Sequence, residues 1–255
     1  MKKLTCAGAI FFAVLLLAAS PAATPAQSSD EDRRRCYNPN PDISIDGCTA
    51  MIRAPGELDA NRAVAFTDRG IAYMEKGDFD RAIHDFDQAI RLNPDDADAF
   101  GYRGSAYDQK GDDKRAVQDF NQAIQMNPNS ARFLNSRCWA RAILGDLQLA
   151  LTDCNKSLRL NSNEATFDSR GLVYLKMKNA DAAIADYNAV LAIDPKVSSS
   201  LYGRGLAEHM KGNESASQAD ITAAVKLQSD IAAQFAKWSV PAPAAAVVSA
   251  TPASK

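Results

Sequence analysis

Five consecutive copies of one pattern, about 34 residues long, fill most of this chain. Each copy carries a small residue at the same place, and the steps between these residues are 34, 34, 33 and 34 positions. The small residues are Gly70, Gly104, Cys138, Gly171 and Gly205. Repeats of this period form solenoids, in which each unit packs on its neighbours and no unit is stable alone. The single shorter step predicts a deletion in a turn between copies.

Each copy is predicted to be a pair of helices. Apolar residues recur at helical spacing in two stretches per copy, and turn signals such as the Lys-Gly-Asp of residues 76–78 and 110–112 separate the stretches. Small residues let the two helices approach closely, and bulky residues fill the remaining space. A bulky position lies sixteen residues after each small one and holds Phe86, Phe120, Cys154, Tyr187 and Ile221.

This order of small, aromatic and proline residues resembles the tetratricopeptide repeat (TPR) family. The resemblance implies an all-α fold, a right-handed α-solenoid of about five TPR helix pairs with N- and C-terminal capping helices. The five repeats would cover residues 61–229, as 61–94, 95–128, 129–162, 163–195 and 196–229. An N-terminal cap is expected at residues 27–60, where residues 42–54 resemble a second repeat helix, and a C-terminal capping helix at residues 229–239.

The N-terminus has the composition of an export signal. A basic start at residues 1–3, an apolar run at residues 7–19 and small residues after it predict a signal peptide over residues 1–26. The apolar run is shorter than the roughly 20 residues of a spanning helix, so no membrane span is expected after cleavage. Cleavage after Ala22 or Ala23 is the alternative to cleavage after Ala26.

The composition of the mature chain excludes some partners. Removing residues 1–26 deletes two lysines and no acid, which leaves 27 basic and 31 acidic side chains and a net charge of −4. The charges are interspersed rather than gathered in a basic stripe, so nucleic acid is not an expected partner. Residues 240–255 are rich in Pro and Ala and are predicted to be a disordered tail.

Four cysteines follow the signal, and an even number in an exported chain predicts two disulfides. The pairs Cys36–Cys48 and Cys138–Cys154 are favoured over the other pairings because each is local in sequence. Cys138 and Cys154 also occupy a small and a bulky position that pack together within a helix pair. Two free buried thiols are the alternative for this second pair. The first bridge would pin an extended segment at residues 37–41, where prolines oppose a helix.

Arginine and aspartate recur where the family commonly has Leu and Tyr. Each Arg directly precedes the small residue and each Asp directly precedes the bulky position, so we expect ion pairs, within a copy or between neighbours. The arginines are Arg69, Arg103, Arg137, Arg170 and Arg204, and the aspartates are Asp85, Asp119, Asp153, Asp186 and Asp220. A row of arginines that binds an acidic ligand is the alternative.

The resemblance also places a partner-binding groove along the first helix of each repeat. Its front is polar and acidic and its rear apolar, so the rear is expected to hold an anchor pocket in which Trp139 and Tyr202 are exposed. The candidate groove residues are Ile71, Met74, Asp108, Asn135, Trp139, Asp168, Leu172, Leu175, Tyr202, Leu206 and Met210. The Lys and Asn set with which some family members clamp a C-terminal carboxylate is absent from these positions.

These features predict an exported scaffold that binds a protein or peptide partner in the cell envelope, as a periplasmic or secreted protein of a Gram-negative bacterium. The chain resembles Cys-containing TPR proteins of such bacteria. No nucleophile with a base, no catalytic carboxylate pair and no metal cluster stands out, so we expect neither an enzyme nor a cofactor or metal. The alternative is envelope glycan binding through Trp139, Tyr202 and Asp168, because an aromatic ring beside carboxylates can hold a sugar face.

Overall fold

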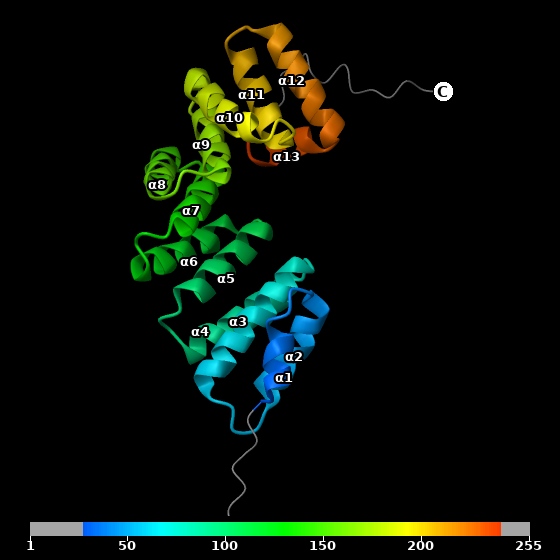
Figure 1. The fold of residues 1–255 in the computed structure, drawn as a ribbon. Coiled ribbons are helices and arrows are strands. Elements are labelled where there is room, and N and C mark those ends of the chain that lie inside the picture. Colours follow the sequence, from blue (N-terminus) through cyan, green and yellow to red (C-terminus); the bar gives the residue numbers. More distant parts are fainter. Residues whose placement is uncertain (1–27, 241–255) are drawn as a thin grey trace, which may run out of the picture.

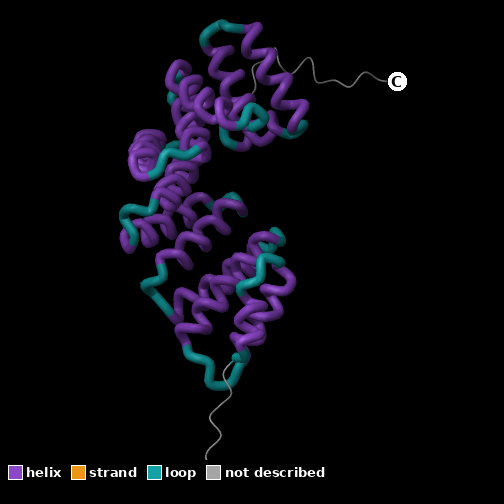
Figure 2. Tube along the Cα trace, in the orientation of Figure 1, coloured by secondary structure: helices purple, strands orange, loops and turns teal. Residues whose placement is uncertain are grey.

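The computed structural model describes residues 28–240, which form thirteen α-helices and no strand (Figures 1 and 2). The all-α solenoid prediction is confirmed. The predicted signal peptide and all but the first residue of the predicted tail lie outside the described residues. In chain order the helices are α1 (Asp30–Cys36), α2 (Pro41–Arg53), α3 (Asp59–Glu75), α4 (Phe79–Leu92), α5 (Ala97–Gln109), α6 (Asp113–Met126), α7 (Ala131–Leu144), α8 (Leu147–Leu160), α9 (Glu164–Lys176), α10 (Ala180–Ile193), α11 (Ser198–Met210), α12 (Glu214–Leu227) and α13 (Ile231–Lys237).

Consecutive helices pack in pairs, and each pair packs on the next to form a curved stack (Figure 1). The stack begins with α1 and α2 and continues through five pairs, from α3–α4 to α11–α12, before α13 closes it. The deletion inferred from the repeat spacing lies between α8 and α9. That turn has three residues, 161–163, whereas the other turns between the five repeats have four. Within residues 28–240, no helix combines the length and hydropathy needed to cross a membrane.

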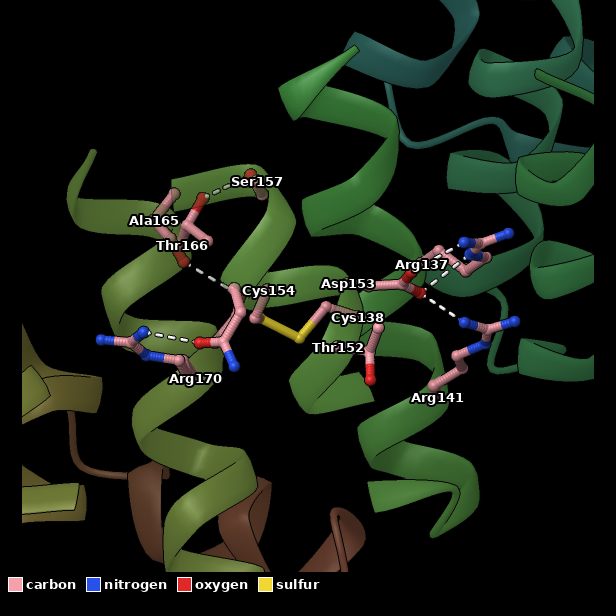
Figure 3. Close-up of a disulfide and its surroundings, with 12 residues drawn as sticks. Arg137, Cys138, Arg141, Thr152, Asp153, Cys154, Ser157, Ala165, Thr166 and Arg170 are labelled. Atoms are coloured by element: carbon pink, nitrogen blue, oxygen red, sulfur yellow. Dashed lines mark hydrogen bonds and ion pairs between the residues drawn. A yellow bond between two sulfur atoms is a disulfide. The ribbon is translucent and has the colours of Figure 1, made fainter. Parts of the chain in front are cut away.

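The small and bulky positions meet inside each pair, as the repeat pattern predicts. A Cβ atom on Gly70 would lie 2.6 Å from the ring of Phe86, and one on Gly171 would lie 2.7 Å from the ring of Tyr187. These glycines therefore set the distance between the two helices of their pair. In the third pair a disulfide between Cys138 and Cys154 replaces this contact, with a Cα–Cα distance of 5.4 Å (Figure 3).

The N-terminal cap differs from the prediction in one respect. Residues 30–36 form a helix that was not predicted, and residues 37–40, where an extended segment was expected, form a short turn that contains Pro39. Ser29 begins α1 with a capping box, in which its hydroxyl accepts from the Asp32 amide and the Asp32 carboxylate accepts from the Ser29 amide. Pro41 then occupies the first turn of α2, where a missing amide hydrogen costs nothing.

The cap is itself a closely packed helix pair. A Cβ atom on Gly47 of α2 would collide with the backbone of Cys36, so only glycine lets α1 lie this close. The predicted Cys36–Cys48 disulfide joins the two helices, with a Cα–Cα distance of 4.4 Å, and both cysteines are buried. The bridge thus holds a helix pair, rather than an extended strand, at the front of the stack.

The five recurring arginines and aspartates form the expected ion pairs, and all five lie within a repeat. Each Arg donates from Nε and Nη2 to both carboxylate oxygens of its Asp, at 2.7–2.8 Å in every pair. Bidentate pairs of this kind are the strongest Arg–carboxylate contacts. Each pair therefore ties the two helices of its repeat together.

The third nitrogen of each arginine also reaches the preceding helix pair. Nη1 donates to the side chain two positions after the aspartate position of that pair, so the ion pairs connect neighbouring repeats as well. The acceptors, in the order of the arginines, are Thr49 at 2.9 Å, Asp87 at 2.6 Å, Asn121 at 2.7 Å, Asn155 at 2.7 Å and Asn188 at 2.7 Å. With all three nitrogens engaged, this Arg–Asp ladder is structural and not a row of free arginines.

Candidate functional site on the concave face

The inner face of the curved stack is built from the first helix of each repeat. All eleven candidate groove residues lie on these helices, α3, α5, α7, α9 and α11. The rear helices α7, α9 and α11 pack side by side, whereas α3, α5 and α7 touch one another only slightly. The rear of this face is therefore closed by direct helix packing, and the front is more open.

The capping helix α13 covers the rear of the inner face. The ring of Phe235 lies 4.8 Å from that of Tyr202 and 4.9 Å from that of Trp238. Trp238 in turn meets Trp139 of α7 edge to face, with 4.8 Å between ring centroids. The end of α13 thus reaches from the last repeat to the third, and the chain's own aromatic residues fill the place where we expected a partner's anchor.

This arrangement corrects the expected exposure of the rear groove. Tyr202 was expected to be exposed but is only 1% exposed, because Phe235 covers its ring. Trp139 is partly buried. Leu172, Leu175 and Leu206 are also buried, in the same C-terminal core cluster. Of the candidate residues, Met210 has the largest exposed fraction, 43%, and Ile71, Met74, Asp108, Asn135 and Asp168 are partly exposed.

The residues considered for glycan binding are not arranged for it. Asp168 accepts hydrogen bonds from the hydroxyls of Ser199, at 3.1 Å, and Ser200, and burial raises its pKa. Asn135, which holds the same repeat position one copy earlier, has a buried side-chain oxygen without a partner among the described residues. A sugar would need the Asp168 carboxylate and the Tyr202 ring to be accessible together. The carboxylate is instead hydrogen-bonded to Ser199 and Ser200, and Phe235 covers the ring.

The front of the inner face carries a coupled pair of carboxyl groups. Burial raises the pKa of Asp108, at the end of α5, to about 7, and its hydrogen bond with Asp113 contributes to the shift. Burial also raises the pKa of Asp113, at the start of α6, although the charge of Lys176 opposes this. The other repeats have apolar pairs or, in the last copy, His209 and Glu214 at these positions. The two neighbouring carboxyl groups therefore both have raised pKa values.

Replacing Asp108 by Asn is expected to make stability less dependent on pH. The folded protein keeps a proton that the unfolded chain releases above pH 4, so the parent loses stability as pH rises from about 4 to about 7. Asp108→Asn should remove this loss and raise the free energy of unfolding at pH 8 by roughly 1 kcal/mol or more. Urea denaturation at pH 5 and pH 8 measures the effect, with the exposed Asp95→Asn as the control. Parallel pH profiles for parent and Asp108→Asn would contradict it.

A second buried carboxyl group, which was not among the predicted groove residues, lies at the front opening. Asp68 of α3 has one carboxylate oxygen buried without a partner among the described residues, and burial raises its pKa to about 6. It lines a cleft of about 220 Å³ between α3 and the α1–α2 turn, together with Glu75 and Tyr37. The sequence does mark Asp68 as unusual, because the equivalent residues of the other four repeats are Tyr, Ser, Ser and Gly.

The rear of the inner face retains one open hollow beside α13, which we call the rear pocket. Its volume is about 480 Å³. Its lining residues come from the ends of α9, α11 and α13 and are Leu175, Lys176, Lys178, Leu206, His209, Met210, Ser239 and Val240. Only Leu175, Leu206 and Met210 of these were predicted as groove residues. Lys178, Ser239 and Val240 lie outside the helices, where a pattern based on helix faces does not reach.

Comparisons with known proteins agree with the repeat architecture. Residues 67–131 and residues 167–197 each match a family model of the tetratricopeptide repeat. A search of curated proteins by sequence found no match. Among solved structures, a tetratricopeptide repeat protein from Parabacteroides merdae is 17% identical, with a TM-score of 0.64 over 86% of this chain and 93% of that chain.

Two further solved structures share the fold at low sequence identity. PilW, described as a type IV pilus biogenesis factor, is 18% identical, with a TM-score of 0.61 over 69% of this chain and 85% of its own. YrrB, described as a TPR protein with an unusual peptide-binding site, is 21% identical, with a TM-score of 0.54 over 69% of this chain and 92% of its own. The sequence matches identify tetratricopeptide repeats at residues 67–131 and 167–197, and the helix pairs and the solved structures show that the whole array has the tetratricopeptide repeat fold.

Proposed function

We propose that this protein is an exported scaffold that binds a protein or peptide partner through its concave face in the cell envelope. The observation that carries the proposal is the inner face itself, a continuous surface of five first helices that still has an open pocket with the exposed side chain of Met210 at its edge. Solenoids of this kind use their concave surface for binding. The peptide-binding site named for YrrB supports the same use of the fold.

Export is supported by two separate features of the chain. The predicted signal peptide over residues 1–26 would direct the protein out of the cytoplasm. Both disulfides, Cys36–Cys48 and Cys138–Cys154, fit an oxidising compartment, since such bonds are rare in the cytosol. Cell fractionation combined with thiol alkylation tests this. The full chain should be found oxidised in the envelope fraction, and a chain without residues 2–26 should remain reduced in the cytoplasm.

Site-specific photocrosslinking in cells tests the binding face. A photoreactive amino acid is placed, one position at a time, at the exposed last residues of three first helices, which serve as the groove positions: Glu75 of α3, Gln109 of α5 and Met210 of α11. Matched positions on the outer helices are Ile193 and Lys226, which are also exposed. The proposal expects one and the same protein to be captured from at least two groove positions and from neither outer position. Capture from the outer positions alone would place the partner on the convex face and refute the proposal.

A further inference from the structure

The rear pocket combines an apolar floor with a basic rim. Leu175 and Leu206 are buried beneath it, and Met210 and Val240 complete its apolar wall. Three basic side chains, Lys176, Lys178 and His209, also line it, and no acidic residue does. This composition is unusual for the chain as a whole, because the mature protein has more acidic than basic side chains.

Lys178 has a backbone conformation that residues with a side chain disfavour. The equivalent residue of the other four repeats is glycine, and all four glycines, Gly77, Gly111, Gly145 and Gly212, have φ between 73° and 90°. Lys178 adopts the same left-handed region, with φ of 60°, where a side chain is disfavoured. Strain that persists at one copy of a repeat, when glycine serves in every other copy, points to a role for the side chain.

Lys178 is also the basic group of the rim that other residues leave free. Lys176 donates from Nζ to the carbonyl oxygen of Ala142 at 2.6 Å, at the end of α7, and Nδ1 of His209 lies 3.0 Å from the Glu214 carboxylate. Among residues 28–240, Lys178 has no side-chain hydrogen bond or ion pair. An unpaired ammonium group beside an apolar pocket favours a ligand that has a carboxylate next to an apolar group.

We propose that the rear pocket binds an apolar side chain from a partner segment with acidic neighbouring residues, and that Lys178 pairs with one of the partner's carboxylates. This inference rests on the proposed function, binding of a protein or peptide at the concave face, and adds the chemistry of the partner. The apolar floor provides the burial of the anchor, and the rim charge selects the segment by electrostatic complementarity.

The C-terminal cap of α13 forms one wall of the site. The amide of Val240 donates to the carbonyl of Phe235 at 2.9 Å, and Ser239 takes the left-handed conformation of a helix C-cap, with φ of 62°. Trp238, directly before them, packs on Trp139, and these are the only two tryptophans of the chain. Occupation of the pocket should therefore change the intrinsic tryptophan fluorescence.

The experiment begins with a random 12-residue peptide library displayed on phage and selected on the mature protein, residues 27–255. The proposal expects the selected peptides to carry Asp or Glu next to Leu, Ile, Phe or Met. A synthetic copy of the best peptide should bind the parent with a change in tryptophan fluorescence. Its affinity for Lys178→Gly should be about three- to tenfold lower, since a rim ion pair is lost. Lys226→Ala, which removes an exposed lysine from the outer helix α12, should bind like the parent.

The same variant separates a binding role from a structural one. Because glycine fits the left-handed position, Lys178→Gly should raise the Tm of the free protein by about 2–4 °C while it weakens peptide binding. Selected peptides that are neutral or basic, or that bind Lys178→Gly as tightly as the parent, would overturn the inference and leave the proposed function standing. Selection of no peptide would also overturn it, and the crosslinking in cells then decides the proposed function separately.

Discussion

Arg170→Leu is expected to lower the free energy of unfolding by about 3–5 kcal/mol. Both oxygens of Asp186 accept hydrogen bonds from Arg170, at 2.7 and 2.8 Å, and the Asp186 side chain is only 6% exposed. Removal of the arginine leaves this carboxylate buried without its partner, and the bond from Nη1 to Asn155 of the preceding repeat is lost too. Urea denaturation followed by circular dichroism measures the loss.

Two further variants show whether the loss arises from the unpaired charge. Arg170→Leu combined with Asp186→Tyr restores the residue types that are common in the family, so it should lose much less stability than the single variant. Arg137→Leu should also lose less, because Asp153 keeps a hydrogen bond of 2.6 Å from Arg141 (Figure 3). Equal losses in Arg170→Leu and its double variant would show that the Arg170–Asp186 pair does not act as described.

Removal of the second disulfide is the other change with a large expected effect. Cys138→Ala with Cys154→Ala should lower the free energy of unfolding by about 3 kcal/mol, the value expected for a bridge that closes a loop of this size. The two alanines also leave space between α7 and α8, since Cys138 and Cys154 are both 0% exposed in the parent. Thermal unfolding without reductant gives the comparison with the parent.

A matched variant distinguishes the covalent bond from the packing. Cys138→Gly with Cys154→Phe installs the glycine–phenylalanine contact of the first two repeats, as at Gly70 and Phe86. It should be more stable than the double alanine variant, and treatment with reductant should leave its third repeat unaffected. If the double alanine variant unfolds at the parent's temperature under oxidising conditions, the bridge contributes no stability and the expectation is wrong.

The repeat pattern predicted the helix pairs and the Arg–Asp contacts because these depend on residues close together in the sequence. Gly70 and Phe86, or Arg170 and Asp186, are sixteen positions apart, and the same spacing recurs in every copy. Five copies of one geometry leave little freedom for the helix register. The α1 helix was not predicted because it has only seven residues, too few to show a helical repeat of apolar positions, and its one local signal is the capping box of Ser29 and Asp32.

The rear of the concave face could not be derived in the same way. Trp139 and Trp238 meet across the curve of the stack, and their contact depends on the small rotations that accumulate over three repeats. The spacing of residues within one repeat does not report these accumulated rotations, so the burial of Tyr202 beneath Phe235 was not predicted. The left-handed conformation of Lys178 was likewise hidden, although its alignment with four glycines was present in the sequence.

The Arg–Asp ladder gives the array a direction in which it should come apart. Each arginine reaches backward to the preceding pair, so loss of the last pair removes Arg204 and breaks the ladder only at Asn188, whose polar side chain water can solvate. Loss of the α1–α2 cap instead removes the hydrogen bond from Arg69 to Thr49, and a partly buried guanidinium nitrogen then has no acceptor. The ladder therefore favours fraying from the C-terminal repeat toward the N-terminus, and the packing of Phe235 and Trp238 on Tyr202 and Trp139 opposes it.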